Sequence, residues 1–120
     1  MPPYVPPGWP ETVPPPSADG WEEAAIQWLF DLVPPAYRQH DVLRDYPAAL
    51  VAVAWHHVKA CHDGTLDGYR RVRTDLSAHI PPHAIDDVLD AYRQEGIRLK
   101  AARSGISLVG RALRSEIFTP

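Results

Sequence analysis

The sequence predicts an all-α fold: a small helical bundle built on a long antiparallel helical hairpin, with a proline-rich extended N-terminal arm. Two long apolar seams with heptad-like spacing, separated by a double proline at residues 81–82, predict the hairpin. No stretch alternates apolar and polar residues with enrichment in β-branched side chains, so we expect no strands. With 120 residues, 45% of them hydrophobic, the chain is long enough for one domain with a core.

The predicted N-terminal arm, residues 1–16, holds eight of the fourteen prolines. Because proline fixes φ and lacks an amide donor, we expect this stretch to be extended, close to polyproline II. Trp9 and the other apolar side chains of the arm leave three alternatives open. The arm is a disordered leader, packs across the protein's own helices, or binds a partner. Residues 17–120 form the predicted helical domain.

The first predicted helix follows Asp19, which is a good N-cap, with Glu22 three residues later as in a capping box. The double proline at residues 34–35 ends this helix. A short turn or helix is then expected over residues 36–45. The apolar face of the first helix has the spacing of a single helical stripe and comprises Trp21, Ala24, Ala25, Trp28, Leu29 and Leu32.

The first long helix is predicted to begin at Pro47 and to run for about thirty residues, ending before Pro81. Gly64 and Gly68 each cost about 1 kcal/mol relative to alanine inside a helix. Because the seam keeps its phase across both glycines, we expect a continuous but weakened helix. The seam steps alternately by four and three residues through Val51, Trp55, Val58, His62, Thr65, Tyr69, Val72 and Leu76.

The second long helix is predicted to begin with Pro82 as its first residue. Ser104-Gly105 predicts a break in it, with Ser107 capping a last helix that ends at about Ser115. The two long helices are expected to pack antiparallel, with the first helix lying across them. The second seam comprises Ile85, Leu89, Tyr92, Gly96, Leu99, Arg103, Ile106, Gly110 and Leu113.

A histidine-rich cluster at residues 56–62 is a candidate metal site. His57 and Cys61 are one helical turn apart, so both side chains can ligate one ion, with His62 as a third candidate. On the alternative interpretation, His62 is a partly buried seam histidine with a hydrogen-bond partner. No feature of the sequence indicates an oxyanion hole or a third group that would orient the histidine, so we do not expect catalysis by Cys61. We also expect no cofactor. Further ligands would have to come from elsewhere in the fold: His40, His79 or His83.

The charges are unevenly distributed along the chain, whose net charge is −3. Residues 1–67 hold three basic and nine acidic side chains, whereas residues 68–120 hold nine basic and six acidic ones. Five cations share one face of the second long helix: Arg93, Lys100, Arg103, Arg111 and Arg114. Three roles of this basic stripe stay open. It binds phosphate backbones, it contacts a partner protein or a second copy, or it pairs with acidic side chains of residues 1–67. Those acidic side chains are drawn from Asp31, Asp41, Asp45, Asp63 and Asp67.

The chain resembles a group of small helical proteins of high-GC actinobacteria such as streptomycetes. The resemblance covers residues 20–115 approximately and is carried by the segments GWEE at 20–23, WLFDL at 28–32, PP at 34–35, YR at 37–38, His40, VLR at 42–44, GYR at 68–70, PP at 81–82 and EGIRL at 95–99. It implies a bacterial cytoplasmic protein, and it implies no activity, cofactor or catalytic residue.

Composition narrows the functional classes. The single cysteine excludes a disulfide framework and is typical of a reducing compartment. No apolar run reaches the ~20 residues that cross a bilayer, and the N-terminus lacks a secretory signal, so we expect a cytoplasmic location and no membrane contact. The acidic isoelectric point of about 6.0 disfavours nucleic acid as the partner.

These observations favour a non-enzymatic protein-interaction or regulatory protein, with self-association as one form of it. The partner is another protein or a second copy, and the aromatic anchors are Trp9, Trp28, Trp55, Tyr69 and Tyr92. Two alternatives stay open: nucleic-acid binding through the basic stripe, and metal or small-ligand binding at the cluster of residues 56–62.

Overall fold

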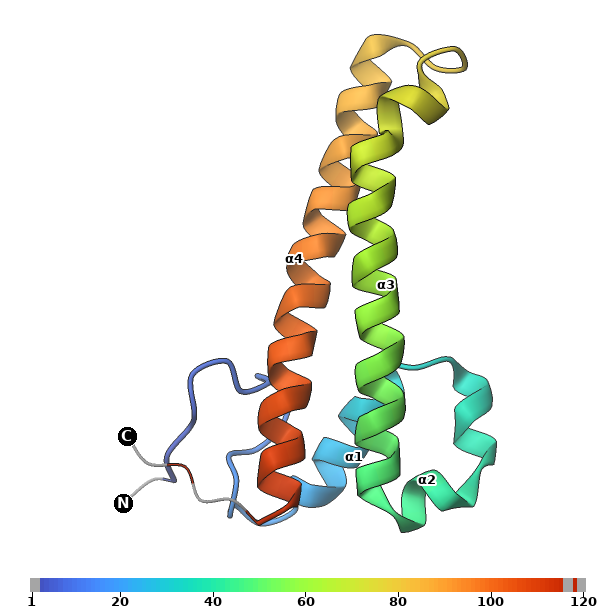
Figure 1. The fold of residues 1–120 in the computed structure, drawn as a ribbon. Helices are drawn as coiled ribbons and strands as arrows, with labels where there is room; N and C mark the ends of the chain where they lie inside the picture. Colours follow the sequence, from blue (N-terminus) through green and yellow to red (C-terminus); the bar gives the residue numbers. More distant parts are fainter. Residues whose placement is uncertain (1–2, 116–117, 119–120) are drawn as a thin grey trace.

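The computed structural model describes residues 3–115 and 118 and shows an all-helical chain (Figure 1). The described residues contain no β-strand, so the predicted all-α class is confirmed. In chain order the elements are α1 (Trp21–Asp31), the 3₁₀ helix η1 (Pro35–Gln39), α2 (Asp41–Asp45), α3 (Pro47–Leu76) and α4 (Pro82–Leu113).

The two long helices, α3 and α4, lie side by side and run in opposite directions (Figure 1). The α3 helix has 30 residues and continues through Gly64 and Gly68, as its unbroken seam predicts. Pro82 is the first residue of α4, where its missing amide hydrogen breaks no helical hydrogen bond. In the connecting turn the amides of His79 and Ile80 both donate to the carbonyl oxygen of Leu76, at 2.8 and 3.1 Å.

The predicted break at Ser104-Gly105 is wrong, because α4 is continuous over 32 residues and Ser107 lies inside it. Gly105 is buried, and a Cβ added there would lie 2.9 Å from a ring carbon of Trp28 and 3.2 Å from Pro10. The bare backbone therefore lets both side chains pack closely on α4. This packing offsets the cost of about 1 kcal/mol that glycine imposes on a helix.

The predicted N-cap at Asp19 is also wrong. The residue before α1 is Gly20, which has a left-handed φ of +76°, and no side chain caps the helix. Glycine adopts this conformation without steric strain, so the turn into α1 is made by the backbone. The helix packs against both α3 and α4 at the end where α3 begins and α4 ends, here called the base (Figure 1).

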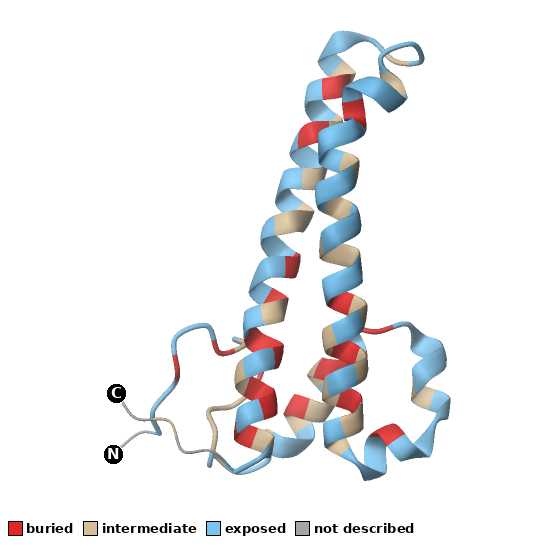
Figure 2. Cartoon of the chain, viewed as in Figure 1, coloured by how far each residue is buried: buried red, intermediate tan, exposed pale blue. Residues whose placement is uncertain are grey.

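Buried side chains form two separate clusters along the hairpin (Figure 2). At the base, α1 and the N-terminal segment that precedes it (residues 3–20) cover α3 and α4. The opposite end, called the tip, has a smaller cluster. The base cluster comprises Trp9, Val13, Ala25, Leu29, Phe30, Val33, Leu43, Leu50, Ala54, Val58, Leu99, Ala102, Ile106, Val109 and Ala112, and the tip cluster comprises Val72, Ile85 and Leu89.

The N-terminal segment contributes Trp9 and Val13 to the base cluster. The indole Nε1–H of Trp9 donates to the carbonyl oxygens of Val13 and Pro14, at 3.0 and 3.1 Å. Its ring centroid lies 6.0 Å from that of Trp21 and 6.3 Å from that of Phe118. These contacts join the segment to α1 and to the C-terminal part of the chain.

Candidate functional site

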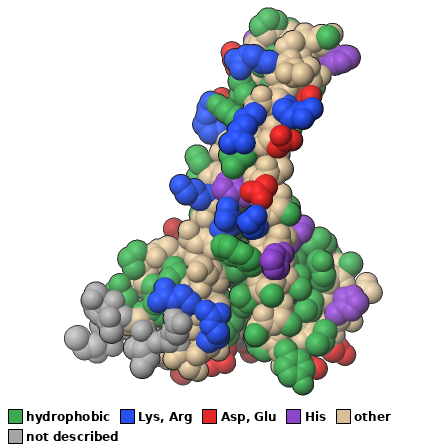
Figure 3. Space-filling model, in the orientation of Figure 1, with side chains coloured by type: hydrophobic (Ala, Val, Ile, Leu, Met, Phe, Trp, Pro, Cys, Tyr) green, Lys and Arg blue, Asp and Glu red, His purple; other side chains and the backbone are tan. Residues whose placement is uncertain are grey.

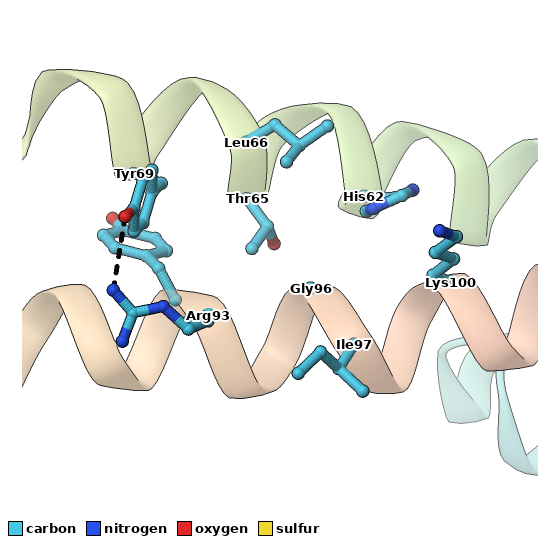
Figure 4. Close-up of a pocket in the computed structure, with 9 residues that line it drawn as sticks. His62, Thr65, Leu66, Tyr69, Arg93, Gly96, Ile97 and Lys100 are labelled. Carbon is cyan, nitrogen blue, oxygen red and sulfur yellow. Dashed lines mark hydrogen bonds between the residues drawn. The ribbon is translucent and has the colours of Figure 1, made fainter.

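An open groove lies between α3 and α4 midway along the hairpin, with a volume of about 310 Å³ (Figure 4). We call it the mid-hairpin groove. The helical segments beside it, residues 59–71 and 90–98, contain no fully buried residue. The groove is lined by His62, Thr65, Leu66, Tyr69, Tyr92, Arg93, Gly96, Ile97 and Lys100.

The groove forms because small seam residues face each other across the two helices. A Cβ added at Gly96 would lie 4.0 Å from the methyl carbon of Thr65, so no large side chain fills this level of the seam. One turn further along α3, a Cβ at Gly68 would lie only 2.6 Å from the ring of Tyr92. Gly68 therefore allows the Tyr92 ring to lie against the α3 backbone, at the tip end of the groove.

Three apolar side chains in the groove are accessible to water. Leu66 is 39% exposed, Tyr69 37% and Ile97 67%. Single exposed apolar residues are ordinary on protein surfaces, but these three line one concave site. Such a site favours contact with another apolar surface.

Arg93 and Tyr69 bridge the two helices at the edge of the groove. The Arg93 guanidinium donates to the Tyr69 hydroxyl oxygen at 3.3 Å (Figure 4). Arg93 also forms an ion pair with Asp90. The hydrogen bond to Tyr69 and the neighbouring Asp90 carboxylate raise the pKa of Arg93. Arg93 is therefore a cation at the edge of the groove that is hydrogen-bonded to a groove residue.

His62 lies at the opposite end of the groove and is bound to Arg103. The Arg103 Nη1 atom is 3.0 Å from the His62 Nδ1 atom. A guanidinium only donates, so Nδ1 accepts and this hydrogen bond requires the neutral imidazole with its proton on Nε2. Arg103 also lies over the Trp55 ring, 5.2 Å from its centroid. His62 therefore has the geometry of a partly buried seam histidine with a partner.

The structure brings together two of the three predicted metal ligands. The Cys61 Sγ and His57 Nε2 atoms are 3.5 Å apart, whereas His62 contacts Arg103. In the described part of the chain, no three His, Cys, Asp or Glu side chains are grouped so that they could hold a metal ion. The other candidates lie outside the cluster: His40 between η1 and α2, and His79 and His83 at the tip.

Two of the predicted aromatic anchors line the mid-hairpin groove, and the other three pack in or against the base cluster. Trp9 is buried in the base, and Trp28 is partly buried against Gly105. Tyr69 and Tyr92 line the mid-hairpin groove, and Trp55 lies under Arg103. Sequence reasoning missed Leu66 and Ile97. The available signal was their position, since each directly follows a small seam residue and flanks the seam.

The cations of the predicted basic stripe have different surroundings. Arg93 and Arg103 have the partners described above, and Arg111 lies 4.9 Å over the ring of Phe118. Among the described residues, no carboxylate forms an ion pair with Lys100 or Arg114. Of the acidic residues proposed to face the stripe, two pair with other cations: Asp31 with Arg38 and Asp63 with Lys59.

In the described residues, no helix is both long enough and apolar enough to cross a membrane. The chain matches no protein family, no curated protein and no solved structure.

Proposed function

We propose that this is a non-enzymatic interaction protein that receives another protein, or a second copy of itself, in the mid-hairpin groove. One observation carries the proposal: in the part of α3 and α4 where Leu66, Tyr69 and Ile97 are exposed, neither helix has a fully buried residue. A bacterial cytoplasmic setting is part of the proposal and rests on the sequence resemblance and the single cysteine.

The energetic reason is the apolar surface that the hairpin leaves in water. Covering the exposed part of a side chain such as Ile97 is worth about 1 kcal/mol or more. The hairpin also supplies orientation, because the groove is held between a packed base and a packed tip. A partner that adds a third helical layer at this level would bury the part of the seam that the hairpin leaves open.

Two measurements test the proposal together. Light scattering over a concentration series detects a second copy, and fluorescence anisotropy measures binding of three labelled helical peptides of about 20 residues. The peptides share one apolar stripe and differ only in their flanking residues, which are all glutamate, all glutamine or all lysine. We expect either concentration-dependent dimerisation or binding of at least one peptide.

A matched pair of variants locates the contact. Leu66→Glu with Ile97→Glu places two charges in the groove and should weaken the observed association at least tenfold, the equivalent of about 1.4 kcal/mol. The control, Val5→Glu with Val42→Glu, changes two exposed residues outside the groove, 51% and 53% accessible. A mass of one chain at every concentration, together with no binding of any peptide, would contradict the proposed function.

A further inference from the structure

The mid-hairpin groove continues along α3 and α4 toward the base. A second hollow of about 570 Å³ shares His62 and Lys100 with it, and a third of about 170 Å³ shares Trp55 and Ser107 with the second. A fourth hollow of about 280 Å³ shares Val51, Gly110 and Arg114 with the third. Because neighbouring hollows share lining residues, we treat the four as one long groove, which follows α4 from Tyr92 to Leu113 over about 30 Å.

The long groove is lined by four cations and, among the described residues, by one carboxylate, while Asp90 pairs with Arg93 outside the lining. Arg93, Lys100, Arg103 and Arg114 line it, and Asp45 at its base end is the one lining carboxylate among the described residues. Lys100 and Arg114 have no carboxylate partner in that part of the chain. Figure 3 shows lysine and arginine side chains along the hairpin, interspersed with hydrophobic ones and with several aspartate or glutamate side chains.

We infer that the occupant of the long groove is an acidic amphipathic helix of a partner protein. The inference rests on the proposed function and names the partner's chemistry. The apolar lining requires an apolar stripe on the occupant, and the cations require carboxylates flanking that stripe. A helix of about 20 residues spans the 30 Å groove.

Charge complementarity favours this occupant over a second copy. In a symmetric dimer the same face of each copy meets the other, so Lys100 and Arg114 would approach the same cations of the second protomer. A nucleic acid would pair with the cations, but its phosphates would leave side chains such as Leu66 and Ile97 uncovered. An acidic amphipathic helix covers both the charged and the apolar parts of the groove.

The three peptides described above test this occupant directly. We expect the glutamate-flanked peptide to bind about tenfold more tightly than the glutamine-flanked one, from the ion pairs with Lys100 and Arg114. The lysine-flanked peptide should bind most weakly. The preference for glutamate should shrink as salt is added, because the pairs lie at a solvent-exposed rim.

Charge reversal assigns the preference to the groove. Lys100→Glu with Arg114→Glu should remove or invert the preference for the glutamate-flanked peptide, while the thermal unfolding midpoint stays near that of the unmodified chain, because both side chains are exposed. The control, Arg70→Glu with Arg71→Glu, makes the same change in net charge at exposed residues that line none of the four hollows. It should keep the preference.

The outcomes separate the inference from the proposed function. If the glutamine- or lysine-flanked peptide binds as tightly as the glutamate-flanked one, the acidic occupant is wrong and the interaction groove stands. Dimerisation without peptide binding, or tighter binding of an oligothymidylate strand than of any peptide, also overturns the acidic helix. Absence of both peptide binding and dimerisation contradicts the inference and the proposed function together.

Discussion

The base and the tip of the hairpin are built from the same two helices but are held together differently. At the base, α1 and the N-terminal segment form further layers on α3 and α4, so residues such as Leu50 and Ile106 are enclosed on several sides. At the tip, α3 and α4 pack only on each other, and Val72, Ile85 and Leu89 are the residues they bury. Two helices alone enclose one narrow stripe, whereas a third layer encloses a core.

The middle of the hairpin differs from both ends. It lacks the covering layers of the base, and its seam residues Thr65 and Gly96 are too small to meet as those of the tip do. The comparison shows that small seam residues in an uncovered part of a helical pair leave an open site. At the base, the small residue Gly105 is instead covered by Trp28 and Pro10.

The largest expected effect compares truncation at the two ends. Leu50→Ala in the base should lower the free energy of unfolding by about 4 kcal/mol, because the surrounding layers prevent the cavity from collapsing. Leu89→Ala at the tip should lower it by about 2 kcal/mol, since only two helices enclose the site. Urea denaturation measures both values. Equal losses would show that the tip is as enclosed as the base.

An intermediate effect compares two glycines inside the long helices. Gly105→Ala should destabilise the fold by about 1–3 kcal/mol, because its new methyl group would lie 2.9 Å from the Trp28 ring. Gly64→Ala should instead stabilise it by about 1 kcal/mol, since no atom lies within 4 Å of the added Cβ and alanine favours the helix. Thermal unfolding of the two variants should shift in opposite directions. An upward shift in both variants would show that helix propensity, rather than packing, decides both sites.

The smallest effect concerns one exposed carboxylate beside the middle of the hairpin. The hydrogen bond from Lys59, with the charges of Lys59 and Arg103, lowers the pKa of Asp63. The ion pair therefore stabilises the fold above the pKa of Asp63 in the unfolded chain, and this contribution is lost as pH falls through the folded-state pKa. An NMR titration should find the pKa below its ordinary value, and Lys59→Gln should raise it. The control Arg71→Gln should leave the pKa unchanged, and an unchanged pKa in Lys59→Gln would show that the pair does not form in solution.

The positions of the long helices could be predicted because the signals for them are local. Pro47 and Pro82 each mark a first helical residue, and the seam keeps one phase between them even across Gly64 and Gly68. A helix needs only a continuous apolar stripe and suitable ends, both of which are visible in neighbouring residues.

The errors and omissions arose where distant residues meet. Ser104-Gly105 has the local features of a break, but Trp28 and Pro10 pack on that backbone and the helix continues. Asp19 has the local features of a cap, but the left-handed Gly20 makes the turn. Leu66 and Ile97 belong to different helices, so the groove they share was not visible in either seam.

The sequence by itself determined the all-α class, the first residues of the two long helices and the place of the turn between them, because prolines and seam periodicity act over a few residues. Only the tertiary structure decided which part of the seam is covered. Coverage depends on where α1 and the N-terminal segment pack, and those contacts join residues far apart in the chain. The tertiary structure also decided which cations of α4 line an apolar groove, because α3 supplies the opposite wall of that groove.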